Sequence, residues 1–238
     1  MKQYGLVLFD IDGTLTRSQH GFIPFNEAFL KTFGFAGDIR TVIPDGNTDP
    51  LIVEEIFAKA GRRAQDGEAW QQTFATNLRD SYARAIREGR TTVRVLPGVL
   101  ELVQALGNFP GLYPGIVTGN FEVTARIKLE AAGLSGYFPV GAYGSDARNR
   151  TDLPGIAKRR WEEMAGASLG PERCVVVGDT PKDLEAARAN RMKCALVGTG
   201  RYAGEQLLSC GPDACLKDLS DTGAAITTLL ALLQIPVG

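Results

Sequence analysis

Residues 5–16 read GLVLFDIDGTLT, and this stretch decides the fold. The apolar run that opens it is interrupted at an Asp-Gly pair, which is typical of a buried strand that meets a loop. Gly13 lets the chain turn sharply beside the carboxylates of Asp10 and Asp12. The sequence therefore predicts a first strand with two acidic side chains at its carboxyl end.

Further apolar runs follow, and most of them end at polar residues or glycine. They span residues 115–117, 140–143, 174–177 and 194–197, with a short edge strand at 214–216. Helical patterns lie between them, at residues 99–106, 122–132, 155–165 and 182–189. This alternation predicts an α/β fold, a Rossmann-like parallel sheet flanked by helices. In such sheets the ligand binds beyond the carboxyl ends of the strands.

One region breaks the alternation. Between Thr16 and about Val95 there is no buried-strand pattern, but helical patterns occur at residues 25–33, 51–60 and 70–88. They predict an α-helical cap subdomain, residues 17–94, inserted after the first strand. The core then consists of residues 1–16 and 95–238, and residues 91–95 return the chain to it.

Composition excludes several classes of protein. The 238 residues carry a net charge of -1 and are 44% hydrophobic, so no global field favours nucleic acid or an anionic membrane. No apolar stretch approaches the roughly 20 residues of a membrane helix, and the start is too short for a signal-peptide core. We expect a cytoplasmic protein. Cys174 and Cys194 are interpreted as buried small hydrophobes, and Cys210 and Cys215 lack the ligand pairs of a zinc site.

The first chemical motif is the pair Asp10 and Asp12. Side chains two residues apart on a strand point to the same side, roughly 6–7 Å apart along the chain. One carboxylate can therefore attack a phosphorus atom while the other handles the leaving oxygen. Taken alone, the pair could also be a solvated strand-end turn.

A second acidic motif, VGDTPKD, follows the run at 174–177. Asp179, placed in one cleft with Asp10, would create a concentration of negative charge that is costly without a cation. A hard divalent ion such as Mg²⁺ is the natural partner. The alternative is that Asp179 or Thr180 caps the helix that begins at Pro181, and both interpretations can hold together.

Two further features suit a phosphate group. Thr118-Gly119-Asn120 offers a hydroxyl and free backbone N–H groups before a helix, although Asn120 could be a simple helix cap. A cation should offset the charge of the phosphoryl group. The candidates are Arg148, Arg150 and Lys158, and Arg150 is favoured because it lies just before the helix opened by Pro154. His20, the single histidine, is interpreted as a loop residue.

Together these segments resemble the haloacid dehalogenase-like (HAD) hydrolase superfamily, and the helical insert resembles the cap of phosphoglycolate phosphatase-like members. The resemblance implies that Asp10 is the nucleophile, forming an aspartyl-phosphate, and that Asp12 is the general acid and base. Asp10, the backbone carbonyl of Asp12 and Asp179 would hold Mg²⁺, with Asp183 as a further ligand or support. Thr118 would bind a phosphoryl oxygen, and Arg150 would supply the catalytic cation, with Lys158 as the alternative.

The cap segment Gly46-Asn47-Thr48-Asp49 resembles the substrate loop of phosphoglycolate phosphatase-like relatives, with Asn47 in place of their basic residue. Asn47 and Thr48 are therefore expected to contact the substrate, as are Gly119 and Asn120. The presence of Asp12 favours phosphate chemistry over carbon–halogen cleavage.

These features predict a Mg²⁺-dependent phosphatase that acts on a small phosphorylated metabolite, either phosphoglycolate-like or a sugar phosphate. Two alternatives stay open at this point: a sugar phosphomutase of the same superfamily and a non-catalytic phosphate-binding protein. The expected partner is a small-molecule phosphate ester, with no nucleic acid and no membrane. The sequence leaves open whether the protein is a monomer or a homodimer, and whether Mg²⁺, Mn²⁺ or Co²⁺ serves best.

Overall fold

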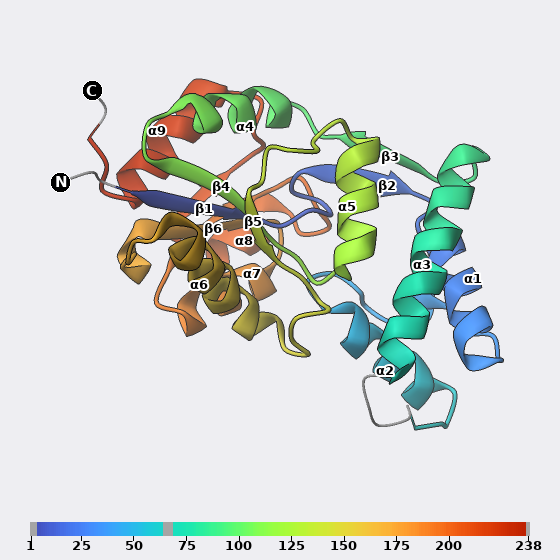
Figure 1. Ribbon diagram of the computed structural model, residues 1–238. Coiled ribbons are helices and arrows are strands. Elements are labelled where there is room, and N and C mark those ends of the chain that lie inside the picture. The colour runs from blue at the N-terminus through green and yellow to red at the C-terminus, as the bar shows by residue number, and fades with distance from the viewer. Residues whose placement is uncertain (1–3, 64–68, 237–238) are drawn as a thin grey trace.

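The computed structural model describes residues 4–63 and 69–236. Its centre is a parallel sheet with the strand order β5-β4-β1-β6-β7-β8 (Figure 1). The strands are β1 (Gly5–Phe9), β4 (Leu112–Val117), β5 (Val140–Ala142), β6 (Cys174–Gly178), β7 (Lys193–Val197) and β8 (Ala214–Leu216). All of the predicted core strands are present, and the predicted α/β fold is confirmed.

Helices cover both faces of this sheet (Figure 1). One face packs against α4 (Val99–Asn108), α5 (Glu122–Ala131) and α9 (Thr222–Leu232), and the other against α6 (Leu153–Ala165), α7 (Pro181–Ala189) and α8 (Gly204–Ser209). Successive side chains of β1 point to opposite faces of the sheet. Val7 lies in the hydrophobic cluster with α4 and α9, and Leu8 lies in the cluster with α6 and α7. This double burial explains why β1 is apolar throughout.

The cap is joined to the core by a two-stranded antiparallel ribbon of β2 (Thr16–Gln19) and β3 (Thr92–Val95). Between these strands lie α1 (Phe22–Phe33), α2 (Asp49–Lys59) and α3 (Ala69–Arg87), so the predicted helical insert is confirmed. The three helices share a core rich in aromatic side chains, including Phe25, Phe29 and Phe74. Short 3-10 turns occupy Ile39–Thr41, Arg150–Asp152 and Pro171–Arg173.

Apart from the 3-10 turns, four of the described helices and strands were not expected from the sequence: β2, β3, α8 and α9. The sequence of β2, TRSQ, has no apolar run, because only Thr16 is buried and the strand pairs with β3 alone. Cys174 and Cys194 are buried in β6 and β7, as expected. Within residues 4–63 and 69–236, no helix is both long and apolar enough to cross a membrane.

Candidate active site

Three neighbouring strands deliver polar side chains to one edge of the sheet. β1 lies between β4 and β6, and Phe9 pairs with Ile116 on one side and Val177 on the other. The strand ends are therefore level, and Asp10 follows β1 just as Thr118 follows β4 and Asp179 follows β6. The backbone N–H of Asp10 donates to the Val177 carbonyl at 2.9 Å, which holds the first carboxylate against the end of β6.

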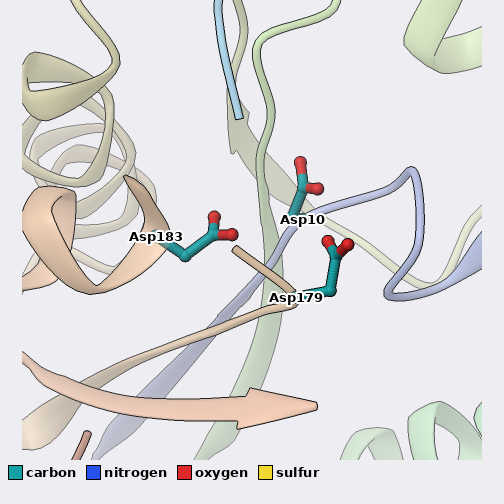
Figure 2. Close-up of side chains that lie close together, drawn as sticks. All are labelled: Asp10, Asp179 and Asp183. Atoms are coloured by element: carbon teal, nitrogen blue, oxygen red, sulfur yellow. The ribbon is translucent and has the colours of Figure 1, made fainter. Parts of the chain in front are cut away.

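Asp10, Asp179 and Asp183 form a buried acidic cluster whose side chains lie close together (Figure 2). One carboxylate oxygen from each lies within 4.8 Å of the others. Burial, with the charge of neighbouring carboxylates, raises the pKa of Asp10 to about 6 and that of Asp179 to about 9. A cation among these oxygens would offset both effects, so the cluster is able to hold a metal ion.

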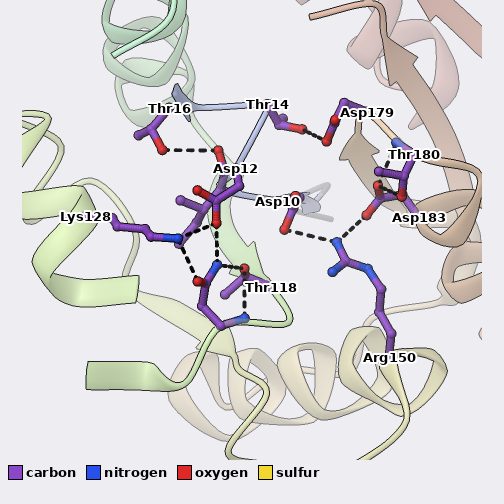
Figure 3. A network of polar contacts seen from close by, with 12 residues as sticks. Asp10, Asp12, Thr14, Thr16, Thr118, Lys128, Arg150, Asp179, Thr180 and Asp183 are labelled. Carbon is purple, nitrogen blue, oxygen red and sulfur yellow. Dashed lines mark hydrogen bonds and ion pairs between the residues drawn. The ribbon is translucent and has the colours of Figure 1, made fainter. Parts of the chain in front are cut away.

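Asp183 has partners of its own within the cluster. At the start of α7 its Oδ2 accepts hydrogen bonds from the Thr180 backbone N–H at 3.0 Å and the Thr180 hydroxyl at 2.8 Å. Its Oδ1 accepts from Arg150 Nη2 at 2.5 Å (Figure 3). The helix-capping interpretation of this motif therefore holds together with the acidic cluster, and Asp183 fixes both α7 and Arg150 beside Asp179.

Arg150 is the cation that reaches the cluster. Its Nη2 lies 3.0 Å from Asp10 Oδ1, and its side chain is 6% exposed. In the described part of the chain its Nε is buried without a hydrogen-bond partner. The other two candidates lie elsewhere: Lys158 pairs with Glu162 on its own helix at 2.9 Å, and Arg148 pairs with Glu54 of the cap at 2.6 Å.

Lys128 belongs to the site, and sequence reasoning missed it. From the buried face of α5 its Nζ lies 2.6 Å from Asp12 Oδ2 and 2.8 Å from Asn120 Oδ1 (Figure 3). Partial desolvation opposes the charge of this half-exposed carboxylate, but Lys128 and the hydrogen bond from Asn120 outweigh it and lower the pKa of Asp12. The available signal was helical spacing, which places Lys128 on one face with Ala125 and Leu129.

The turn after β4 lies between Asp12 and the cap. Thr118 Oγ1 accepts hydrogen bonds from Asn120 Nδ2 at 2.9 Å and from its backbone N–H at 3.3 Å, so the hydroxyl proton is available to a ligand. Asn120 Nδ2 also donates to Asp12 Oδ2 at 2.8 Å. A Cβ added at Gly119 would overlap the carbonyl oxygen of Asn47, so only glycine lets the cap loop lie this close.

The cap loop is fixed to the core by several hydrogen bonds. The Asp49 backbone N–H donates to Gly119 O at 2.8 Å, and its carboxylate accepts from the Phe121 N–H at 2.8 Å. The buried Thr48 hydroxyl donates to Arg148 O at 2.6 Å, so Thr48 connects cap to core and is not among the residues that line the cavity. Asn47 does line the cavity, and its Oδ1 accepts from Lys182 Nζ.

A cavity of about 200 Å³ lies between the acidic cluster and the cap. Asp10, Asp12, Thr118, Gly119, Asn120, Arg150 and Asp179 line its core side, together with Lys128 and Thr180. The cap closes the other side with residues from α1, α2, α3 and the loop before α2. Nearly all the predicted site residues thus surround one space; Thr48 and Asp183 lie behind its lining.

A parallel sheet with an acidic cluster at its carboxyl edge and an inserted helical cap defines a class of capped α/β enzymes. The chain belongs to the haloacid dehalogenase-like hydrolases, because residues 4–190 match the model of that family. The phosphoglycolate phosphatase of Synechococcus elongatus is 26% identical over 226 residues, which cover 94% of this chain and 98% of that protein. The phosphoglycolate phosphatase of Shigella boydii is 28% identical over 233 residues, which cover 90% of this chain and 89% of that protein.

Solved structures agree on the fold. A hydrolase from Pseudomonas syringae superposes with a TM-score of 0.68 at 23% identity, covering 94% of this chain and 98% of that one. The fold of this structure agrees with the family match over residues 4–190, and it is that match which confirms the predicted superfamily. The predicted enzyme class is confirmed as well: the chain is a hydrolase, and both relatives named above are phosphatases.

Proposed function

We propose that this protein is a Mg²⁺-dependent phosphatase that hydrolyses a small phosphorylated metabolite through an aspartyl-phosphate on Asp10. The observation that carries the proposal is the position of Asp10. It lies in the acidic cluster, it contacts Arg150 at 3.0 Å, and it lines the same cavity as Asp12 and Thr118. The proposed nucleophile, a second acid and the proposed phosphate-binding groups therefore face one cavity.

The residues fit a hard divalent cation, since the cluster offers only carboxylate oxygens and burial penalises their charge. Asp10, Asp179 and the backbone carbonyl of Asp12 would hold it, with Asp183 as a further ligand or as support. When bound, Mg²⁺ would let the carboxylates ionise together and offset the charge of the phosphoryl oxygens.

The chemistry itself falls to side chains of this chain. An oxygen of Asp10 forms a bond to phosphorus as the bond from phosphorus to the leaving oxygen breaks, and Asp12 gives a proton to that oxygen. Asp12 then takes a proton from water, and the water oxygen displaces Asp10 and yields inorganic phosphate. Arg150 and the Thr118 hydroxyl bind phosphoryl oxygens and stabilise the charge that develops on them.

The test is phosphate release from a panel of phosphorylated metabolites and an aryl phosphate, with and without Mg²⁺. Wild type, Asp10→Asn and a surface control, Asp80→Asn, would be compared; Asp80 is half-exposed on α3 and pairs with its neighbour Arg79. We expect turnover that requires both Mg²⁺ and Asp10 and is unchanged in the control. Undiminished release by folded Asp10→Asn would reject the mechanism.

Two other functions would give different results in the same assay. A sugar phosphomutase would interconvert sugar phosphates without net release of phosphate and would need a bisphosphate activator. A non-catalytic phosphate-binding protein would bind inorganic phosphate and turn over none of the esters.

The proposal includes two expectations about the protein in the cell. We infer a cytoplasmic enzyme, which cell fractionation would test, and a monomer or homodimer, which light scattering would distinguish. Proteins of this composition and near-neutral net charge are not drawn to nucleic acid or membranes by charge alone.

A further inference from the structure

We propose that the leaving group of the substrate is a small alcohol that carries no charge. The enzyme would then favour phosphate monoesters of uncharged alcohols over esters that bear a second anionic group, such as a carboxylate. This inference rests on the proposed phosphatase activity and concerns the part of the cavity beyond the phosphoryl group.

The side chains that line the cavity include more carboxylates than cations. Five aspartates line it, at positions 10, 12, 45, 49 and 179, against two cations, Arg150 and Lys128. Asp10 and Asp179 belong to the proposed metal site, so Asp12, Asp45 and Asp49 are the carboxylates that a leaving group would meet. Both cations are already paired with site carboxylates: Arg150 with Asp10 at 3.0 Å and with Asp183 at 2.5 Å, and Lys128 with Asp12 at 2.6 Å. Arg150 serves the phosphoryl group, so neither cation is left for a second anion on the leaving group.

The cap lines its side of the cavity with several apolar side chains. These residues come from every part of the cap, and they are Phe25, Ile39, Pro44, Ile52 and Tyr82. The Tyr82 hydroxyl donates to the Gly21 carbonyl at 3.1 Å, so its ring rather than its hydroxyl is offered to a ligand. Apolar surface of this kind favours carbon atoms of a ligand and penalises a carboxylate taken out of water.

The polar groups at the rim point to the same conclusion. Asp45 and Asp49 would repel an anion, and Asp45 holds Arg201 in an ion pair at 3.1 Å. Lys182 lies outside the lining and donates to Asn47 Oδ1. Carboxylate and amide oxygens at the rim can accept hydrogen bonds from an alcohol hydroxyl, which an uncharged leaving group could supply.

The size of the cavity limits the leaving group further. Its volume of about 200 Å³ lies below the roughly 300 Å³ at which typical small-molecule pockets begin. Since the phosphoryl group would occupy the core side, the room left under the cap favours an alcohol of only a few atoms.

The experiment compares two nearly isosteric esters, 2-phosphoglycolate and 2-hydroxyethyl phosphate, which differ by a carboxylate in place of a hydroxymethyl group. With wild-type enzyme and Mg²⁺, we expect kcat/KM to be at least about tenfold higher for 2-hydroxyethyl phosphate, because the unpaired carboxylate would face aspartates. The variant Asp45→Asn removes one carboxylate at the rim and leaves Arg201 without its ion-pair partner. Because this lowers the repulsion of a second anion, the ratio of the two kcat/KM values should shift toward 2-phosphoglycolate. The control Asp80→Asn should keep the wild-type ratio.

Two outcomes would overturn the inference, and they differ. Equal or faster hydrolysis of 2-phosphoglycolate would show that the cavity accommodates a second anion, while the proposed phosphatase activity would stand. If neither ester nor p-nitrophenyl phosphate released phosphate, the proposed function itself would fall, and the inference with it.

Discussion

Lys128 Nζ lies 2.6 Å from Asp12 Oδ2, and the two partners of this ion pair differ in exposure. The lysine side chain is 6% exposed, whereas the aspartate side chain is 42% exposed. Asn120 completes the arrangement by donating to Asp12 and accepting from Lys128. The general acid and base proposed here is thus held by a cation that comes from a helix and not from any of the strand-end motifs.

This asymmetry predicts unequal costs for the two single substitutions. Asp12→Asn leaves a buried ammonium group facing a neutral amide and should lower the free energy of unfolding by about 3 kcal/mol. Lys128→Met leaves a half-exposed carboxylate that water can solvate and should cost about 1 kcal/mol or less. Urea denaturation of both variants and of the double variant measures this difference. A larger loss for Lys128→Met than for Asp12→Asn would contradict it.

The acidic cluster predicts a metal effect on stability that does not depend on turnover. Mg²⁺ at about 100 times its dissociation constant should stabilise the wild type by about 2.7 kcal/mol, and Asp179→Asn should remove most of this gain. Without metal, the variant should melt no lower than wild type at pH 7, because the pKa of Asp179 is raised to about 9 and its carboxyl is already neutral. Thermal melts with and without Mg²⁺ test both statements.

Asp80→Asn serves as the control for these melts, since it changes a carboxylate far from the cluster to an amide on the surface of α3. It should keep the full response to Mg²⁺. An equal Mg²⁺ response in Asp179→Asn would mean that the ion binds elsewhere.

Gly119 predicts how tightly the cap must fit the core. Gly119→Ala places a methyl group on the Asn47 carbonyl oxygen, so the cap loop must move; we expect a loss of about 1–3 kcal/mol in stability and a lower kcat. Gly107→Ala is the matched control: it lies in α4 with no atom within 4 Å of the added Cβ, and should be neutral or stabilising by up to about 1 kcal/mol. Chemical denaturation and steady-state kinetics of both variants decide the matter, and similar behaviour of the two would refute this role.

Asp49 predicts a pH dependence of stability. Burial raises the pKa of Asp49 to about 6, above its ordinary value of 3.8, so the folded protein holds this proton more tightly than the unfolded chain does. As the pH rises from about 4 to about 6, the contribution of Asp49 to the free energy of unfolding should therefore fall by about 3 kcal/mol in total. Above about pH 6 this contribution should stay level.

Asp49→Asn cannot titrate, so the measurement is the difference in unfolding free energy between wild type and this variant from pH 4 to pH 8. Lys128 and Asp12 act on Asp49 through their charge and are present in both proteins. As the pH rises from 4 to 6, the unfolding free energy of the wild type should fall relative to that of Asp49→Asn. Parallel curves would show that Asp49 is not the titrating group.

The core and much of the site were predictable because apolar runs end abruptly at polar residues. The run at 174–177 is followed by Gly178-Asp179, and the structure ends β6 at Gly178. Neighbouring parallel strands then bring their ends together, whatever the distance along the chain. Arg150 was also predictable, because the start of α6 places it at the same edge.

Other features depend on tertiary contacts that leave little trace in a local pattern. A lysine in a helix is usually solvated, so Lys128 shows its role only when Asp12 lies beside it. Thr48 was expected at the substrate, but the fold turns its hydroxyl to the Arg148 carbonyl, 100 residues away. The strand β2 is polar because it needs only a partner strand and no second layer above it.

The ribbon of β2 and β3 has a consequence for how such an enzyme can change over time. Thr16 pairs with Val95, so the chain leaves and re-enters the core at a single place. A short turn could join these two positions, and all six strands of the main sheet and all three clustered aspartates lie outside the segment between them. Under the proposed function, recombination at this junction would exchange the cap residues that face the leaving group and leave the clustered aspartates of the core unchanged.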